Sequence, residues 1–336
     1  LCIALAASLA VSVPVVFAAE RNRPAEAELP VTYRYVQSMA IDPAGNYIFD
    51  VKGSALIEEF DYTQPLEYEV TLSSSDGTVS AILPVEQSTM GYEAETSLFI
   101  GKTYAAIRDM TSLSGPDANT SATYTNTALK AMIEECFVAM DAHANALALP
   151  ASFRYIRVAA DTSLADGKAY LVAGSAKITD DYTQQLLYYV IVKDGKVADI
   201  LPLVQSTMGY TAELSLFIGK DYAGVNALSD ADVSTSATLT NTALKGMVLE
   251  SLVADDVLTN ARPLDGQYTY VRAAVASSAL GGERFLAEGY ADLYEYDYKQ
   301  PLLYYIRIEG GRVEEILPLV QSTMGYEAEL SLFVGK

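Results

Sequence analysis

The 336-residue sequence contains one histidine, two cysteines and no tryptophan. Zinc sites, iron–sulfur clusters and haem attachment need groups of Cys and His at set spacings, and none occurs here. A Ser-His-Asp or Cys-His mechanism would depend on His143 alone, which lies at the end of a helix pattern in MDAHANA. We therefore expect a surface or helix-end histidine, no catalytic residue and no metal site.

Positive charge is also scarce. The chain has 22 Lys and Arg against 43 Asp and Glu, which gives a formal net charge of −21 at pH 7. A surface of this sign repels polyphosphates, so nucleic acid is excluded as a partner.

The first residues differ in kind from the rest. Residues 1–19 are apolar, contain Pro14 and end in a small-residue pattern at 16–18, as in a secretory signal peptide. An uncleaved membrane anchor is the alternative, because about 20 apolar residues can span a bilayer. The start looks clipped, since it lacks an initiating Met and a basic region. Cleavage leaves Cys136 as the single cysteine, so we expect a secreted or cell-surface protein without an intramolecular disulfide.

The chain contains three copies of one segment. ILPVEQSTMGYEAETSLFIGK ends at Lys102, and close variants end at Lys220 and Lys336, at steps of 118 and 116 residues. Such a period indicates tandem domains rather than solenoid units. The predicted repeats occupy residues 31–146, 152–258 and 267–336. Pro-containing linkers are expected at 21–30, 144–151 and 258–266. The third repeat is expected to be truncated before its hydroxyl-rich stretch, so the chain is expected to be a fragment at both ends.

Within a repeat, strand patterns precede helix patterns. In repeat 2, two apolar runs flank Asp194-Gly195, which is a hairpin signal, and Asp76-Gly77 and Gly310-Gly311 hold the same place in the other repeats. Further strands are expected at 155–160 and 168–178, followed by a short helix at 209–220.

A longer amphipathic helix is expected to follow. In repeat 1, apolar residues recur at helical spacing. They are Leu129, Met132, Ile133, Cys136, Phe137 and Met140. Cys136 is therefore expected in the core. The order of elements predicts an α+β fold of tandem repeats, each an antiparallel sheet with helices packed on one side.

A hydroxyl-rich stretch precedes each long helix pattern: DANTSATYTNTALK at 117–130 and DVSTSATLTNTALK at 232–245. Ser and Thr cap helices, because their oxygens accept hydrogen bonds from free backbone N–H groups. One cap explains one hydroxyl, but not a spaced pattern present twice. The start of a helix also favours a phosphate group. Capping and phosphate attachment are therefore both open from the residues alone.

The stretch resembles the attachment motif of covalent-FMN-binding domains. These occur in subunits of sodium-translocating NADH:quinone reductase, in Rnf complexes and in multi-flavin proteins of extracellular electron transfer. The family motif reads Asp-x-x-(Ser/Thr)-Gly-Ala-(Thr/Ser), usually followed by x-Thr-Ser and a helix. The matching residues are Asp117, Thr120, Ala122 and Thr123, and Asp232, Thr235, Ala237 and Thr238. Ser121 and Ser236 replace the motif's Gly, which matters if that position needs a positive φ.

The resemblance implies one FMN at Thr123 and one at Thr238, each esterified through its phosphate by a dedicated flavin transferase. The segment QSTMGY is similar to the family's Glu-Thr-Pro-Gly segment, which lies near the flavin. It makes Thr89, Gly91, Thr207 and Gly209 candidate contacts, although each Gly could also simply form a turn.

The implied function is electron transfer through covalently bound FMN rather than catalysis. The implied partners are the flavin transferase and a membrane quinone or NADH dehydrogenase-type electron donor. Two alternatives stay open: a repetitive surface binding or adhesion module, and a flavin-dependent reductase whose catalytic domain lies beyond Lys336.

Overall fold

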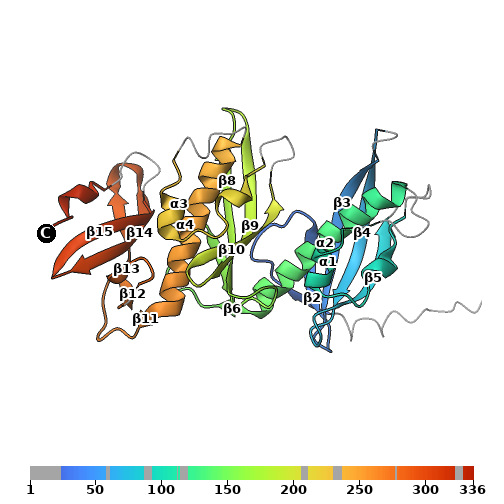
Figure 1. The fold of residues 1–336 in the computed structure, drawn as a ribbon, viewed down its shortest axis with the longest axis horizontal. Helices are drawn as coiled ribbons and strands as arrows, with labels where there is room; N and C mark the ends of the chain where they lie inside the picture. Colours follow the sequence, from blue (N-terminus) through green and yellow to red (C-terminus); the bar gives the residue numbers. More distant parts are fainter. Residues whose placement is uncertain are drawn as a thin grey trace, which may run out of the picture.

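The computed structural model describes residues 24–57, 61–86, 93–111, 113, 120–205, 211–229, 237–276, 278–321 and 328–336. Three five-stranded antiparallel sheets and a small set of helices form roughly repeated units in a row (Figure 1). The predicted signal segment, residues 1–19, lies outside the described residues. Within the described ranges, no helix is long and apolar enough to cross a membrane.

In each sheet the strands lie in chain order, so each strand pairs with its neighbours along the sequence. Sheet 1 contains β1 (Ala25–Ala27), β2 (Val36–Ile41), β3 (Tyr47–Ile57), β4 (Tyr62–Leu72) and β5 (Val79–Glu86). Sheet 2 contains β6 (Ala146–Leu147), β7 (Ile156–Ala160), β8 (Lys168–Lys177), β9 (Thr183–Lys193) and β10 (Lys196–Val204). Sheet 3 contains β11 (Ala261–Arg262), β12 (Val271–Val275), β13 (Glu283–Leu293), β14 (Tyr298–Glu309) and β15 (Arg312–Val320).

The first strand of each sheet comes from a segment that the sequence predicts as a linker. β1, β6 and β11 pair antiparallel with the strands that follow them. Two or three residues are too few to show an alternating pattern, so periodicity does not reveal them. Their backbone groups nevertheless complete the hydrogen bonding of one strand edge.

The predicted hairpins are confirmed. β9 and β10 meet at Asp194 and Gly195, whose φ values of 52° and 70° are those of a tight two-residue turn. β14 and β15 meet in the same way at Gly310 and Gly311, with φ values of 56° and 79°.

Two long helices follow the first two sheets, as the sequence predicts: α2 (Thr120–Ala144) and α4 (Thr238–Asn260). Two short helices precede them: α1 (Tyr104–Arg108) and α3 (Tyr222–Asn226). The short helix expected at 209–220 is wrong in its described part, which holds only the 3₁₀ turn η4 (Leu214–Leu216). Gly219, with φ of 78°, ends this turn before a helix can form. The corresponding turns are η3 (Thr96–Leu98) and η6 (Leu330–Leu332), and η5 (Tyr294–Tyr296) joins β13 to β14.

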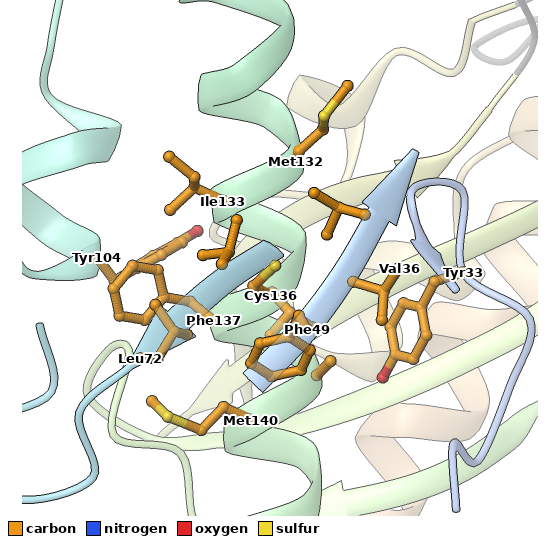
Figure 2. Packing of buried hydrophobic residues seen from close by; sticks show 14 of the residues in the cluster. Tyr33, Val36, Phe49, Leu72, Tyr104, Met132, Ile133, Cys136, Phe137 and Met140 are labelled. Atoms are coloured by element: carbon orange, nitrogen blue, oxygen red, sulfur yellow. The ribbon is translucent and has the colours of Figure 1, made fainter. Parts of the chain in front are cut away.

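We call sheet 1 with α1 and α2 unit 1, sheet 2 with α3 and α4 unit 2, and sheet 3 unit 3. Each long helix lies between two sheets, its own and the next (Figure 1). Figure 2 shows the apolar face of α2, including Ile133, Cys136 and Phe137, against Phe49 and Leu72 of sheet 1. The predicted helix core is confirmed, and the Cys136 side chain is fully buried.

The strands reflect this arrangement in their burial. β9 buries every residue from Leu186 to Val192, because α4 covers one face of sheet 2 and α2 covers the other. β4 instead alternates, with Tyr68 and Val70 buried and Glu67 and Glu69 partly exposed on the outer face. One-sided packing, as expected from the sequence, therefore describes sheet 1 but not sheet 2.

Candidate functional site

The hydroxyl-rich stretches form the starts of the two long helices. Thr123 lies in the first turn of α2, Thr238 is the first residue of α4, and both are half-buried. Ala122 and Ala237, which precede them, are buried. Four further motif residues lie outside the described residues: Asp117, Asp232, Thr235 and Ser236.

The bounds of α2 include Thr120 and Ser121, and Ser121 stands where the motif has Gly.

Two described hydroxyls of the stretches bond within their own helices. The N-cap residue of α4 is Ala237, and its side chain makes no cap hydrogen bond. The hydroxyls of Thr127 and Thr242 donate instead to the carbonyl oxygens of Thr123 and Thr238, at 2.7 and 2.9 Å. These two hydroxyls are satisfied inside the helix and cap nothing.

Asn126 ties two loops to the start of α2. Its side-chain oxygen accepts a hydrogen bond from the N–H of Glu95 at 2.8 Å, and its side-chain nitrogen donates to the carbonyl of Leu113 at 2.7 Å. Glu95 follows the first QSTMGY segment, and Leu113 precedes the hydroxyl-rich stretch. In unit 2, Asn241 accepts from the N–H of Glu213 at 2.8 Å.

In units 1 and 2, the structure thus brings the residues just after QSTMGY into contact with the helix that begins in the hydroxyl-rich stretch. The candidate contacts themselves lie outside the described residues: Thr89, Gly91, Thr207 and Gly209. Sequence analysis missed the role of Asn126 and Asn241, although both follow the motif at the same distance. The shared Thr-Asn pair was the available signal.

Two buried hydroxyl groups without a hydrogen-bond partner recur at matching positions in units 1 and 2. They belong to Tyr68 and Thr125 in unit 1 and to Tyr188 and Thr240 in unit 2, all 0 % exposed. A buried polar group without a partner costs free energy, so native proteins rarely keep one without a reason. Here the same pair occurs at the same positions twice.

In unit 1, both hydroxyls belong to the region held by Asn126. Burial, together with the nearby negative charge of Glu93, raises the pKa of Tyr68 to about 12. Glu93 is two residues before Glu95, whose N–H binds Asn126, and Thr125 directly precedes Asn126. Thr125 is thus adjacent to Asn126 in the chain, and Tyr68 lies close enough to Glu93 to be affected by its charge.

The lysine after the hydroxyl-rich stretch is held by backbone groups. The ammonium of Lys130 donates to the carbonyl oxygens of Arg108 and Met110, at 3.0 and 3.3 Å. Lys245 makes the same pair of bonds at the end of α3. These lysines therefore hold the end of each short helix and the loop after it against the long helix.

His143 has the surface position that its sequence context indicates. It is exposed in the last turn of α2, with Nδ1 3.1 Å from the hydroxyl oxygen of Tyr47. Among the described residues, no group of three or more His, Cys, Asp or Glu side chains could hold a metal ion.

A cavity of about 450 Å³ lies at the junction of units 1 and 2. Arg108 and Asp199 line it and form an ion pair at 2.5 Å, while Glu134 and Tyr35 line it from unit 1. It borders the middle of α2 rather than the helix start. Sequence analysis did not reveal it, because two units build it together.

Comparisons with models of known families, with curated proteins and with solved structures find no match for this chain. The likeness to covalent-FMN-binding domains therefore rests on the motif residues of the sequence.

Proposed function

We propose that this chain is an extracytoplasmic electron carrier whose tandem domains hold FMN covalently, one at Thr123 and one at Thr238. One observation carries the proposal. Each Thr is half-buried in the first turn of a long helix, and the buried Asn three residues later accepts a hydrogen bond from the backbone just after the QSTMGY segment. The three similar units support its tandem-domain part.

In attachment by a flavin transferase, this chain would supply the Thr hydroxyl. The Thr oxygen would form a bond to the FMN phosphorus of FAD as the pyrophosphate bond breaks, AMP would leave, and the hydroxyl proton would pass to a base of the transferase. The product phosphodiester is negative. Free N–H groups and the positive dipole end at the start of α2 favour an anion there, which suits Thr123.

Bound FMN would supply the redox chemistry, and the protein would supply attachment and orientation. Asn126 and Asn241 would hold the loops around it. The hydroxyls of Tyr68 and Thr125, and of Tyr188 and Thr240, would gain partners from its polar atoms. This would remove the cost of four buried groups that the structure leaves unpartnered.

The packing of the units suits a relay. α2 shares one apolar core with sheet 1 and with sheet 2, including Leu187 and Tyr189. Thr123 and Thr238 are therefore parts of one packed body, and bound flavins would keep a fixed separation. The electron donor would be a membrane quinone or NADH dehydrogenase-type complex, in keeping with the predicted signal segment.

The test is the intact mass after denaturation, with in-gel flavin fluorescence, of the chain co-expressed with a flavin transferase from its own source. We expect two FMN units, with one lost in Thr123→Ala and one in Thr238→Ala. Thr127→Ala and Thr242→Ala are matched controls, because they remove a hydroxyl one turn further along each helix, and should keep both flavins. An unmodified, colourless protein would overturn the proposal and favour a surface binding or adhesion module.

A further inference from the structure

One face of sheet 3 is apolar and partly open. Six of its residues are partly exposed: Phe285, Ala287, Leu302, Tyr304, Ile306 and Ile316. Their counterparts in sheet 2 are at most 3 % exposed: Tyr170, Val172, Leu186, Tyr188, Val190 and Ile200. Phe333 shows the same contrast, because it is 54 % exposed while Phe99 and Phe217 are 0 % exposed. In units 1 and 2, a long helix covers this face.

The open face keeps the groove into which that helix packs. A Cβ built on Gly53 or Gly174 would lie 2.3 Å from the methyl carbon of Met132 or Met247, so each glycine makes room for a methionine of the covering helix. A tyrosine ring flanks each glycine. Gly289 holds the same position in sheet 3.

At Gly289 the flanking tyrosine is present without a covering methionine. The ring of Tyr270 lies 3.2 Å from a Cβ built on Gly289, as Tyr155 does at Gly174. Tyr270 is 62 % exposed, whereas Tyr155 is only partly exposed beneath α4.

The covering helices also carry a carboxylate at a set distance from the methionine. Glu135, three residues after Met132, accepts hydrogen bonds from the N–H groups of Arg34 and Val36 at 2.9 and 2.8 Å. Glu250, three residues after Met247, accepts from the N–H of Tyr155 at 2.9 Å. Val271 begins the matching strand of sheet 3, β12, and Tyr270 directly precedes it.

We propose that this face of sheet 3 is a docking surface for an amphipathic helix that carries a methionine followed three residues later by a glutamate. The methionine would fill the space over Gly289 beside Tyr270. The carboxylate of the glutamate would accept hydrogen bonds from the backbone N–H groups of Tyr270 and Val271. The apolar residues between them would cover Tyr304 and Ile306.

The helices of a second copy do not suit this role. The apolar residues of α2 and α4 already lie in cores with two sheets each. The occupant is therefore a helix of the same pattern that has no sheet of its own.

The test uses the full chain and a peptide with the sequence of residues 238–260, which contains Met247 and Glu250. We expect saturable one-to-one binding by calorimetry and slower hydrogen exchange at the amides of Tyr270 and Val271. A Glu250→Ala peptide should bind about tenfold more weakly, because it loses the acceptor oxygens for these N–H groups.

In the chain, Gly289→Leu should fill the groove and weaken binding by at least about tenfold. Tyr294→Ala, at an 88 % exposed side chain beyond β13, should leave binding unchanged. Absence of binding, or binding that neither Gly289→Leu nor the Glu250→Ala peptide weakens, would overturn the proposal. Sedimentation that shows dimers formed through sheet 3 would overturn it as well, by assigning the face to a second copy.

Discussion

The hydroxyl of Tyr189 in sheet 2 donates a hydrogen bond of 2.6 Å to the carboxylate of Asp141 in α2 of the preceding unit. Thr162 and Ser163 donate to the same buried carboxylate, at 2.6 and 2.8 Å. Between units 2 and 3, Asp256 accepts from Tyr305 and Ser278 in the same way. Each junction therefore combines an apolar core with one carboxylate that accepts hydrogen bonds from hydroxyl groups of the following unit.

Tyr189→Phe should lower the free energy of unfolding by about 1.5–3 kcal/mol, the usual range for a hydrogen bond to a charged group. Tyr188→Phe is the matched control. Tyr188 is adjacent and equally buried, but its hydroxyl has no partner, so its loss should be neutral or stabilising in the ligand-free protein. Urea unfolding of both variants measures the difference. Equal losses would show that the bond to Asp141 does not hold the junction.

Stability should depend on pH through Glu250. Burial raises the pKa of its carboxyl from 4.5 to about 7, although N–H groups of Tyr155 and Ile156 act in the opposite direction. The folded state therefore holds a proton that the unfolded chain releases between these values. The stabilisation from this group is complete below pH 4.5 and is lost as the pH rises through about 7.

Glu250→Gln should remove this dependence, since the amide cannot ionise and keeps an acceptor oxygen. Above pH 7 the variant should be more stable than the wild type by up to about 3 kcal/mol, and near pH 4.5 the two should match. Urea unfolding at both pH values checks this, with the exposed Glu314→Gln as control for the removed charge. If the free energies of unfolding of the variant and the wild type differed by the same amount at both pH values, ionisation of the Glu250 carboxyl would not be the source of the pH dependence.

Asn126→Ala should affect one flavin site and spare the other. It leaves the N–H of Glu95 and the carbonyl of Leu113 without their partner, at a cost of about 2–3 kcal/mol. Under the proposed function, FMN should be lost at Thr123 and retained at Thr238, and Asn241→Ala should do the reverse. Intact mass and peptide mapping distinguish the sites. Loss at both sites from either substitution would contradict local loop positioning.

Gly167→Ala should destabilise unit 2 strongly. The φ of Gly167 is +123°, and a Cβ there would lie 2.3 Å from the carbonyl oxygen of Val192. We expect a loss of at least about 2 kcal/mol, because neither backbone can move away without breaking strand pairing. Gly77→Ala, with φ of +63° and open space around it, should cost about 1 kcal/mol. Thermal unfolding would compare them, and similar shifts would contradict the clash.

The sequence predicts well what local signals determine. The turn at Asp194-Gly195 and the apolar spacing from Leu129 to Met140 need only neighbouring residues, and both are confirmed. The two-sided burial of sheet 2 was also readable, because LLYYVIV is apolar throughout where LEYEVTL in sheet 1 alternates. A prediction for a single repeat does not include it, because the second helix that covers sheet 2 belongs to the preceding unit.

The sequence predicts the motif residues of the site but not the contacts that surround them. Asn126 acts through residues 13 and 31 positions away, and no spacing in the sequence indicates such contacts. The unpartnered hydroxyls of Tyr68 and Thr125 depend on packing between a strand and a helix. Such features become visible only when burial and partners are known for each atom.

The charges on the outer face of sheet 1 have a consequence for assembly. The contact of one unit's helix with the next unit's sheet is directional, and directional contacts between identical chains build open filaments. Glu67 and Glu69 occupy the positions at which Leu187 and Tyr189 receive α2 in sheet 2. A foreign helix arriving at sheet 1 would have to bury the carboxylate of Glu69 and the 3.0 Å ion pair of Glu67 with Lys52. Two acidic side chains on one strand thus act as a stop against end-to-end polymerisation.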